Sequence, residues 1–362
     1  MSSRLTDLIT LAREPSSERR RELLREVTDV FFGAPAATGS TELSLFDDVM
    51  SKLAGEMEAA VRAELAERMA DAPSPPTRLV RNLAADAIEV AAPILERSTA
   101  LSDTDLVTLA GVKGQDHLRA LSRRASVSEA LSDAIVERAD DDTLKVLLQN
   151  DGAELSRKAA EAAVDRATVN PALQAAVVDR ASLPIDLLNE MYFAVEARLR
   201  QKIMQRNAEV DPAALEAALA AGRKRVAQSD GALPSDFADA ERIVKALRLR
   251  KAITPPVLAG MLRNGETTKF MIALAELAEI DFHTARRILE RRELDALAVV
   301  CKAAEFERPL FLTFAVLILD KEVNAMGRAK EYGDLYADLP RETAQRTLRF
   351  WRMRRQGADL AA

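Results

Sequence analysis

"VERAD" (136–140) recurs as "VDRAT" (164–168) and "VDRAS" (178–182), and this recurrence indicates a repeat fold. The three arginines, Arg138, Arg166 and Arg180, are 28 and 14 residues apart, and Arg124 precedes the first by 14. A unit of about 14 residues is one short helix and a turn, so two units make a helical hairpin of about 28 residues. Because hydrophobic residues recur at helical spacing in each unit, the sequence predicts a stack of short HEAT-like helical hairpins, an α-solenoid. The member missing from the series falls near Gly152.

The residues that follow each copy have the chemistry of helix starts. Ser126 and Glu129 have capping-box spacing, and Asn170 precedes Pro171, which is a favoured first helical residue. The acidic cluster "ADDDT" at 139–143 also falls at an expected helix start, where carboxylates cap free amides and complement the helix dipole. Because the spacing and glycine of a calcium loop are absent, we interpret this cluster as capping.

Composition indicates an all-α protein. The 362 residues are 48% hydrophobic and 30% charged, with 4% aromatics, 13 glycines and 14 prolines, so strong helix formers outnumber strand formers. This length exceeds one ordinary helical domain. We predict an N-terminal helical region (1–72), a helical-repeat array (76–220) and a C-terminal helical domain (235–362) that ends in a basic helix.

The boundaries rest on proline-rich and glycine-rich stretches, "DAPSPPT" at 71–77 and, more weakly, "AGRKRVAQSDGALPSD" at 221–236. Within the N-terminal region one helix is expected from about Ser40 to Ala70. The C-terminal domain reads as helices without an obvious repeat. Its stretches "ELDALAVVCKAAEF" and "RPLFLTFAVLILDKEV" are apolar nearly all round and are expected at its centre.

Several helix patterns together resemble a bacterial, mostly alphaproteobacterial, helical family known as domain of unknown function 2336. The resemblance covers roughly residues 76–320 and is carried by these stretches: "LAADAIEVAAPILERSTALSDTDLVTLA", "HLRALSRRASVSEALSDAIVERADDDTLKVLLQN", "RASLPIDLLNEMYFAVEARLRQKI", "LAGMLRNGETTKFMIALAELAEIDFHTARRIL" and "LAVVCKAAEF". It implies a repeat fold in a bacterial cytoplasm. It supplies no known activity and no catalytic residues.

No catalytic, metal or cofactor pattern stands out in the sequence. His117 and His283 have no partner at metal-ligand spacing, and "GVKGQD" at 111–116 lacks the lysine and preceding strand of a phosphate loop. Cys301 lies in an apolar helix pattern, as expected for an inert core thiol. The sequence therefore favours a non-enzymatic protein without a cofactor.

Two groups of residues are candidates for contact with a ligand or partner. Arg138, Arg166 and Arg180 fall at helix ends, where they can reach the last carbonyls or form a ladder of ion pairs with the next repeat. Alternatively, they form a row that faces a ligand or partner. The second group is in the basic stretch "RETAQRTLRFWRMRR" at 341–355: Arg346, Arg349, Trp351, Arg352 and Arg355. It is interpreted either as a solvated helix docked through its tryptophan or as a surface for an acidic partner or nucleic acid.

The leading hypothesis is a scaffold or adaptor that binds another protein through the solenoid surface or the basic helix. One alternative is a receptor for a small anionic ligand such as a nucleotide messenger. A nucleic-acid-binding solenoid is the weaker alternative, since the net charge of −6 gives no overall attraction for a polyanion. No transmembrane segment or secretory signal is predicted, so a cytoplasmic location is expected, and the oligomeric state stays open.

Overall fold

The computed structural model describes residues 17–33, 40–211, 213–215, 217–218, 233–319 and 324–361. Throughout these residues the regular elements are helices, and the only strand-like pairing is an isolated bridge between Val127 and Ala153. The predicted all-α class is confirmed. The chain forms two compact units, Met1–Ser182 and Leu183–Ala362, so their division lies inside the range predicted for the array. The stretch expected to separate the array from the C-terminal domain lies mostly outside the described residues.

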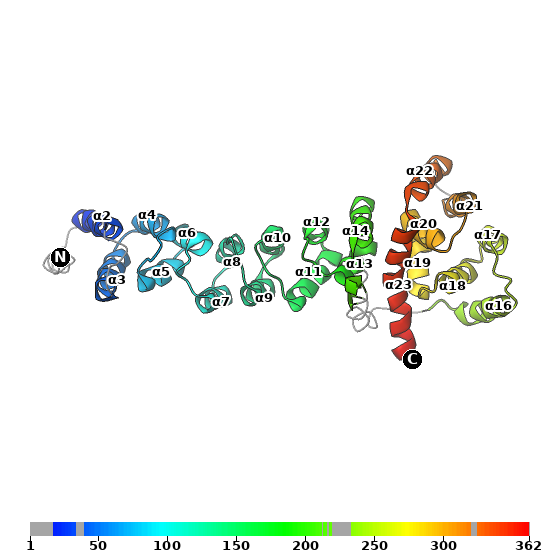
Figure 1. Ribbon diagram of the computed structural model, residues 1–362, viewed down its shortest axis with the longest axis horizontal. Coiled ribbons are helices and arrows are strands. Elements are labelled where there is room, and N and C mark those ends of the chain that lie inside the picture. Colours follow the sequence, from blue (N-terminus) through cyan, green and yellow to red (C-terminus); the bar gives the residue numbers. More distant parts are fainter. Residues whose placement is uncertain are drawn as a thin grey trace. The chain divides into compact units, whose positions relative to one another are not determined.

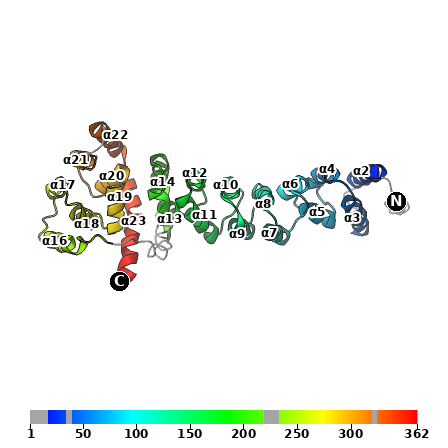
Figure 2. The same cartoon turned by 180° about the vertical axis from the view of Figure 1, so that it is seen from behind.

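The first unit is built from short helices that alternate between two rows. Its helices are α2 (Ser17–Gly33), α3 (Ser40–Gly55), α4 (Ala59–Ala70), α5 (Thr77–Ala84), α6 (Ile88–Arg97), α7 (Asp103–Val112), α8 (Gln115–Ser122), α9 (Glu129–Arg138), α10 (Asp141–Gln149), α11 (Arg157–Val169) and α12 (Pro171–Asp179). Helices α4, α6, α8, α10 and α12 form one row, and α7, α9 and α11 form the other (Figures 1 and 2). Each helix packs against the next member of its own row, as stacked hairpins require.

The hydrophobic stripes predicted for these helices form the core between the rows. Leu131 and Ile135 of α9, together with Leu144 and Leu147 of α10, are completely or almost completely buried. Full burial of one such side chain contributes about 1.5–3 kcal/mol, so each repeat depends on its neighbours to cover its stripe.

Two local predictions for the first unit are wrong. The helix expected from Ser40 to Ala70 is interrupted, because α3 ends at Gly55 and a turn buries Met57 before α4 begins. Glycine has low helix propensity, and burial of the methionine stabilises the turn. The N-cap of α9 is Ser128 and not the predicted Ser126, and the Ser128 hydroxyl accepts a hydrogen bond from the Leu131 N–H. Val127 forms the bridge with Ala153, so the helix begins after it.

The second unit also consists of helices. These are α13 (Ile185–Glu190), the 3-10 helix η1 (Met191–Phe193), α14 (Ala197–Glu209), α16 (Phe237–Leu249), α17 (Pro255–Arg263), α18 (Thr267–Ala278), α19 (Phe282–Glu290), α20 (Leu294–Ala303), α21 (Arg308–Ile318), α22 (Ala325–Asp338) and α23 (Arg341–Ala361). Eight of the ten residues of α20 are buried, as expected for a central helix. In α21 only Phe311, Phe314 and Ala315 are buried, so the prediction of a central position fails for that helix.

A repeat does exist in the second unit, contrary to the expectation from its sequence. Residues with positive φ follow five helices in turn at spacings of 13 or 14 residues: Lys251, Gly265, Glu279, Arg292 and Glu305. After each, a main-chain N–H bonds the carbonyl five residues earlier, as from Ile280 to Ala275 (3.0 Å). This left-handed turn satisfies the end carbonyls of a helix with its own backbone. The sequence does not reveal this repeat, because four of the five left-handed residues are not glycine.

Candidate functional site

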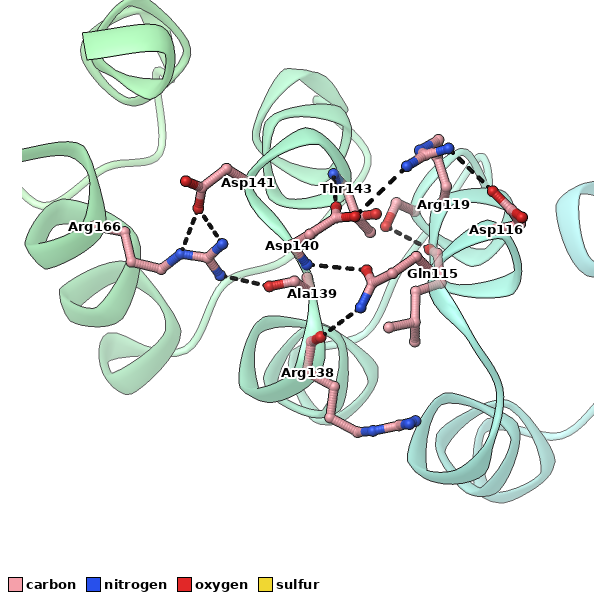
Figure 3. Close-up of polar contacts among 11 residues, drawn as sticks. Gln115, Asp116, Arg119, Arg138, Ala139, Asp140, Asp141, Thr143 and Arg166 are labelled. Carbon is pink, nitrogen blue, oxygen red and sulfur yellow. Dashed lines mark hydrogen bonds and ion pairs between the residues drawn. The ribbon is translucent and has the colours of Figure 1, made fainter. Parts of the chain in front are cut away.

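The repeat arginines lie at the contacts between consecutive repeats. Arg166 projects from α11, where its Nη1 donates to the Ala139 carbonyl (2.8 Å) and its Nε donates to Asp141 Oδ1 (2.9 Å). Figure 3 shows its guanidinium pointing away from its own helix toward these two residues. Ala139 terminates α9 and Asp141 begins α10, so Arg166 closes the end of the preceding helix in its row and pairs with the next helix start.

Arg138 repeats this arrangement one hairpin earlier. It is the last residue of α9, and its Nη1 donates to the carbonyls of Ala110 and Lys113 (2.9 Å to the latter) at the end of α7. Its own carbonyl accepts from Gln115 Nε2 at 2.8 Å, and the Gln115 oxygen accepts from the Asp140 N–H at 2.9 Å (Figure 3). The Gln115 side chain therefore links the end of α9 in one row of helices to the start of α10 in the other.

Arg180 is the most buried member, with 4% of its surface exposed. It follows α12 and donates to the carbonyls of Leu148 (2.9 Å), Asn150 (3.1 Å) and Ala153 at the end of α10. Burial lowers the pKa of this guanidinium. Several carbonyl acceptors nevertheless surround the cation, which satisfies the end of α10 within the protein interior.

Arginines other than the three predicted ones make the same type of contact. Arg124 donates to the carbonyls of Leu95 (2.6 Å) and Ser98 (2.7 Å) at the end of α6. Within the second unit, Arg206 donates to the Leu183 carbonyl at 3.3 Å. Arg206 was missed because the residues around it do not share the "VDRA" letters, although its 26-residue distance from Arg180 would have indicated it.

Asn150 fills the place of the missing arginine. Its Nδ2 donates to the carbonyls of Ser122 (2.8 Å) and Arg124 (2.7 Å), at the end of α8. At position 152, where the series would place an arginine, the backbone leaves no space for a side chain, since a Cβ on Gly152 would lie 2.0 Å from the Ala125 oxygen. A short amide therefore makes the contacts that arginines make elsewhere in the row.

The prediction that these arginines reach terminal carbonyls needs one correction. The carbonyls belong to the preceding repeat. Arg138 is the last residue of α9 and Arg180 follows α12, whereas Arg166 lies inside α11, in its last turn. Arg166 also forms an ion pair with Asp141 across the contact. The row is therefore mainly a set of side-chain caps on neighbouring helices.

Helix starts contribute a second set of contacts between repeats. Asp140 caps α10 by accepting from the Thr143 N–H at 2.7 Å, which confirms the capping role predicted for the acidic cluster. Asp141 Oδ2 accepts from Asn170 Nδ2 at 2.6 Å, and Asn170 itself caps α12. Hydrogen bonds from Asn170 and Arg166 lower the pKa of Asp141, so its carboxylate is held ionised.

The basic C-terminal helix, α23, is docked in the second unit by three of its predicted contact residues. Arg346 donates to the carbonyls of Ala208 (2.6 Å) and Val210 (3.1 Å) at the end of α14, and Arg352 donates to the Ala278 carbonyl (2.8 Å) at the end of α18. Trp351 is 3% exposed and lies against the aromatic rings that precede α14. The exposed residue Arg349 lies on the same helix, and the side chain of Arg355 lies outside the described residues.

A buried charge cluster in the second unit was not anticipated from the sequence. Arg200 of α14 binds both carboxylate oxygens of Asp295 (2.8 and 2.9 Å) and approaches Glu293 Oε1 at 3.3 Å. The side chains of Glu293 and Asp295 are each 5% exposed, and that of Arg200 is 14% exposed. Two carboxylates thus share one guanidinium in an environment with little water.

Glu293 occupies the repeat position that Ala252, Glu266, Ile280 and Phe306 hold after the other left-handed residues. It follows the left-handed residue Arg292, as Ile280 follows Glu279 and Phe306 follows Glu305. Burial raises the pKa of the Glu293 carboxyl to about 7, although the charge of Arg200 acts to lower it.

The two histidines and the cysteine considered in the sequence lie in three different surroundings. Nε2 of His117 lies 2.9 Å from the Asp86 main-chain oxygen, and the His283 ring lies beside Phe282. Cys301 is fully buried, which raises the pKa of its thiol. Over the described residues, no three His, Cys, Asp or Glu side chains gather in a group that could hold a metal ion. None of the described helices combines the length and apolarity needed to span a bilayer.

Comparison with known proteins identifies a family but no function. A search of curated proteins finds no match. A solved structure of an engineered protein matches at 15% identity and covers 97% of this chain and 98% of that chain. Its TM-score of 0.20 is too low to indicate a shared fold. The family model described as "uncharacterised protein conserved in bacteria (DUF2336)" matches residues 90–349, which span most of both units. The chain therefore belongs to the DUF2336 family of bacterial proteins.

Proposed function

We propose that this chain is a non-enzymatic scaffold of the bacterial cytoplasm that binds another protein through the outer surface of its first unit. The observation that carries the proposal is an excess of acidic side chains in the first unit, where the repeat arginines already donate hydrogen bonds to main-chain carbonyls. Residues 1–182 contain 31 Asp and Glu but only 22 Lys and Arg, whereas residues 183–362 contain 26 and 29. The expected partner is therefore a protein segment rich in lysine and arginine.

The contacts of the repeat arginines strengthen this charge asymmetry. Arg124 and Arg180 direct their guanidinium groups to main-chain carbonyls of the preceding repeat. Carboxylates such as Glu137, Asp142 and Glu154 lie exposed on the same unit. An extended row of helices with this charge balance favours a basic partner over DNA or an anionic ligand.

The alternative of a receptor for an anionic ligand would require the same arginines to face outward. Arg180 is almost fully buried, and Arg166 already binds Ala139 and Asp141. Arg138 is exposed, but its guanidinium already donates to the carbonyls of Ala110 and Lys113. A phosphate bound there would have to displace these contacts. The geometry therefore supports protein binding better than phosphate binding.

The experiment is affinity capture from bacterial cytosol with the full-length chain as bait. A variant with Glu137→Gln, Asp142→Asn and Glu154→Gln tests the first unit, and Glu307→Gln, Glu331→Gln and Asp338→Asn make the same charge change on exposed positions of the second unit. We expect a basic protein that is retained by the wild type and the control, is released by salt, and is lost from the test variant. Retention of no specific protein, or equal retention by both variants, would contradict the proposal.

A further inference from the structure

The cluster of Arg200, Glu293 and Asp295 links α14 to the start of α20. Nη1 of Arg200 donates to both carboxylate oxygens of Asp295, and this contact balances the charge of Asp295. Glu293 accepts a single, longer hydrogen bond on Oε1 from Nη2 of Arg200. Its second oxygen, Oε2, is buried and has no hydrogen-bond partner among the described residues. A carboxylate left in this state is strongly destabilised, whereas a protonated carboxyl needs no second cation.

We propose that this cluster is a proton-dependent switch: protonated Glu293 fastens α14 to α20, and ionised Glu293 weakens that contact. In the protonated state, one positive charge on Arg200 is balanced by one negative charge on Asp295. Loss of the proton places a second negative charge beside Asp295 with no additional cation in direct contact. The like charges then favour separation of the two helices or entry of water between them.

The other groups that face the cluster do not remove this imbalance. The charged or titratable side chains that act on Glu293 or on the neighbouring tyrosine are Arg287 and Arg291 near the end of α19, Tyr192 of η1 and Tyr332 of α22. Arg291 donates to the Phe193 carbonyl at 3.1 Å, and the Arg287 guanidinium lies 5.1 Å from the Phe193 ring centroid. Both arginines favour ionisation, but burial outweighs them and the pKa of Glu293 stays near 7.

The contacts of Trp351 provide a reporter beside the cluster. The Arg200 guanidinium lies 5.7 Å from the Tyr192 ring centroid, which lies 5.0 Å from the ring centroid of Trp351. Trp351 is the only tryptophan in the chain. A change in the packing of α14 should therefore alter tryptophan fluorescence without any added label.

The test is a pH titration of the full chain, followed by tryptophan fluorescence. The wild type should show one transition with a midpoint near pH 7, and Glu293→Gln should keep the spectrum of the acidic form throughout. Glu290→Gln, on the exposed end of α19, and His283→Gln should both retain the transition, because both leave Glu293 in place. A flat wild-type titration, or an unchanged midpoint in Glu293→Gln, would overturn the proposal.

Infrared spectroscopy of the wild type gives a second measurement that does not depend on the folding of any variant. A protonated carboxyl has a C=O stretch distinct from that of a carboxylate. We expect one such band at about pH 6 that disappears by about pH 8.5. Absence of any protonated carboxyl at about pH 6 would also overturn the proposal.

Discussion

Arg180 donates a hydrogen bond to the main-chain carbonyl of Asn150 at 3.1 Å, and the Asn150 side chain donates in turn to the carbonyls of Ser122 and Arg124. Each residue thus closes the helix that ends one repeat earlier. In the second unit, left-handed turns close the helices with their own backbone, as at Glu279. The repeats of the first unit should therefore be coupled more strongly to their neighbours through polar contacts.

Replacement of Arg180 by methionine should destabilise the first unit by about 3 kcal/mol, because it leaves several buried carbonyls at the end of α10 without a donor. Arg180→Lys should recover only part of this loss, since a single ammonium group cannot reproduce the planar donors of a guanidinium. Urea unfolding followed by circular dichroism measures both effects.

The matched control is Arg123→Met. The Arg123 side chain is 54% exposed and contacts Glu96 at 3.1 Å, so its loss should change stability by only about 0.5 kcal/mol. An equal loss in both methionine variants would show that burial of the carbonyl contacts is not the source of stability.

Two glycine substitutions should have opposite effects. In Gly152→Ala, the new methyl group would lie 2.0 Å from the Ala125 oxygen, so the backbone must shift and stability should fall by about 2 kcal/mol or more. In Gly111→Ala, within α7, no atom lies within 4 Å of the new methyl group, and stability should rise by about 0.5–1 kcal/mol. Thermal unfolding of the two variants should show midpoints on either side of the wild type, and a shift in the same direction would be inconsistent with the close approach at Gly152.

Short-range sequence patterns predicted the helices of the first unit but not the partners of its arginines. Helical spacing, Asn170 before Pro171 and the "ADDDT" cluster correctly marked helices and their starts. The identity of the carbonyls bound by Arg166 depends on how one hairpin stacks on the previous one, and that contact joins residues 25–27 positions apart. A search for arginine or asparagine at that period, rather than for the letters "VDRA", would have found Asn150 and Arg206.

The buried cluster was harder to predict because its members are far apart in sequence. Arg200 and Asp295 are separated by 95 residues, and no local pattern joins them. The repeat position of Glu293 gives no clear clue, because Ile280 and Phe306 stand there in neighbouring repeats but Glu266 stands there in another. That position also depends on left-handed turns formed by residues such as Lys251 and Glu279, which do not mark such turns in a sequence as glycine does.

Lys251→Gly should stabilise the second unit. Lys251 has φ of 52°, a conformation that is unfavourable for a residue with a side chain, and glycine adopts it without this penalty. The expected gain is about 1 kcal/mol in urea unfolding. Ala246→Gly, at an exposed position inside α16, should instead cost about 1 kcal/mol, and stabilisation by both substitutions would argue against the left-handed turn as the cause.

Stability should depend on pH in opposite directions at the two ends of the range. In the first unit, a hydrogen bond from Arg62 lowers the pKa of Asp86, and bonds from Asn170 and Arg166 lower that of Asp141. Their contributions are present at neutral pH and are lost as the pH falls below the ordinary range for aspartate. Thermal unfolding at successively lower pH should therefore show a falling midpoint, and Asp86→Asn should reduce that dependence.

Glu293 should produce the opposite trend. Its pKa rises from 4.5 to about 7 in the folded chain, so the folded state binds the proton more tightly than the unfolded state does. The resulting stabilisation is fully present below pH 4.5 and is lost as the pH rises through about 7, a change of about 3 kcal/mol. Denaturant unfolding across this range should show the decline in the wild type and in the Glu290→Gln control, but not in Glu293→Gln. A decline of equal size in Glu293→Gln would assign the pH dependence to other groups, because the glutamine cannot ionise while it keeps the size and position of the buried side chain.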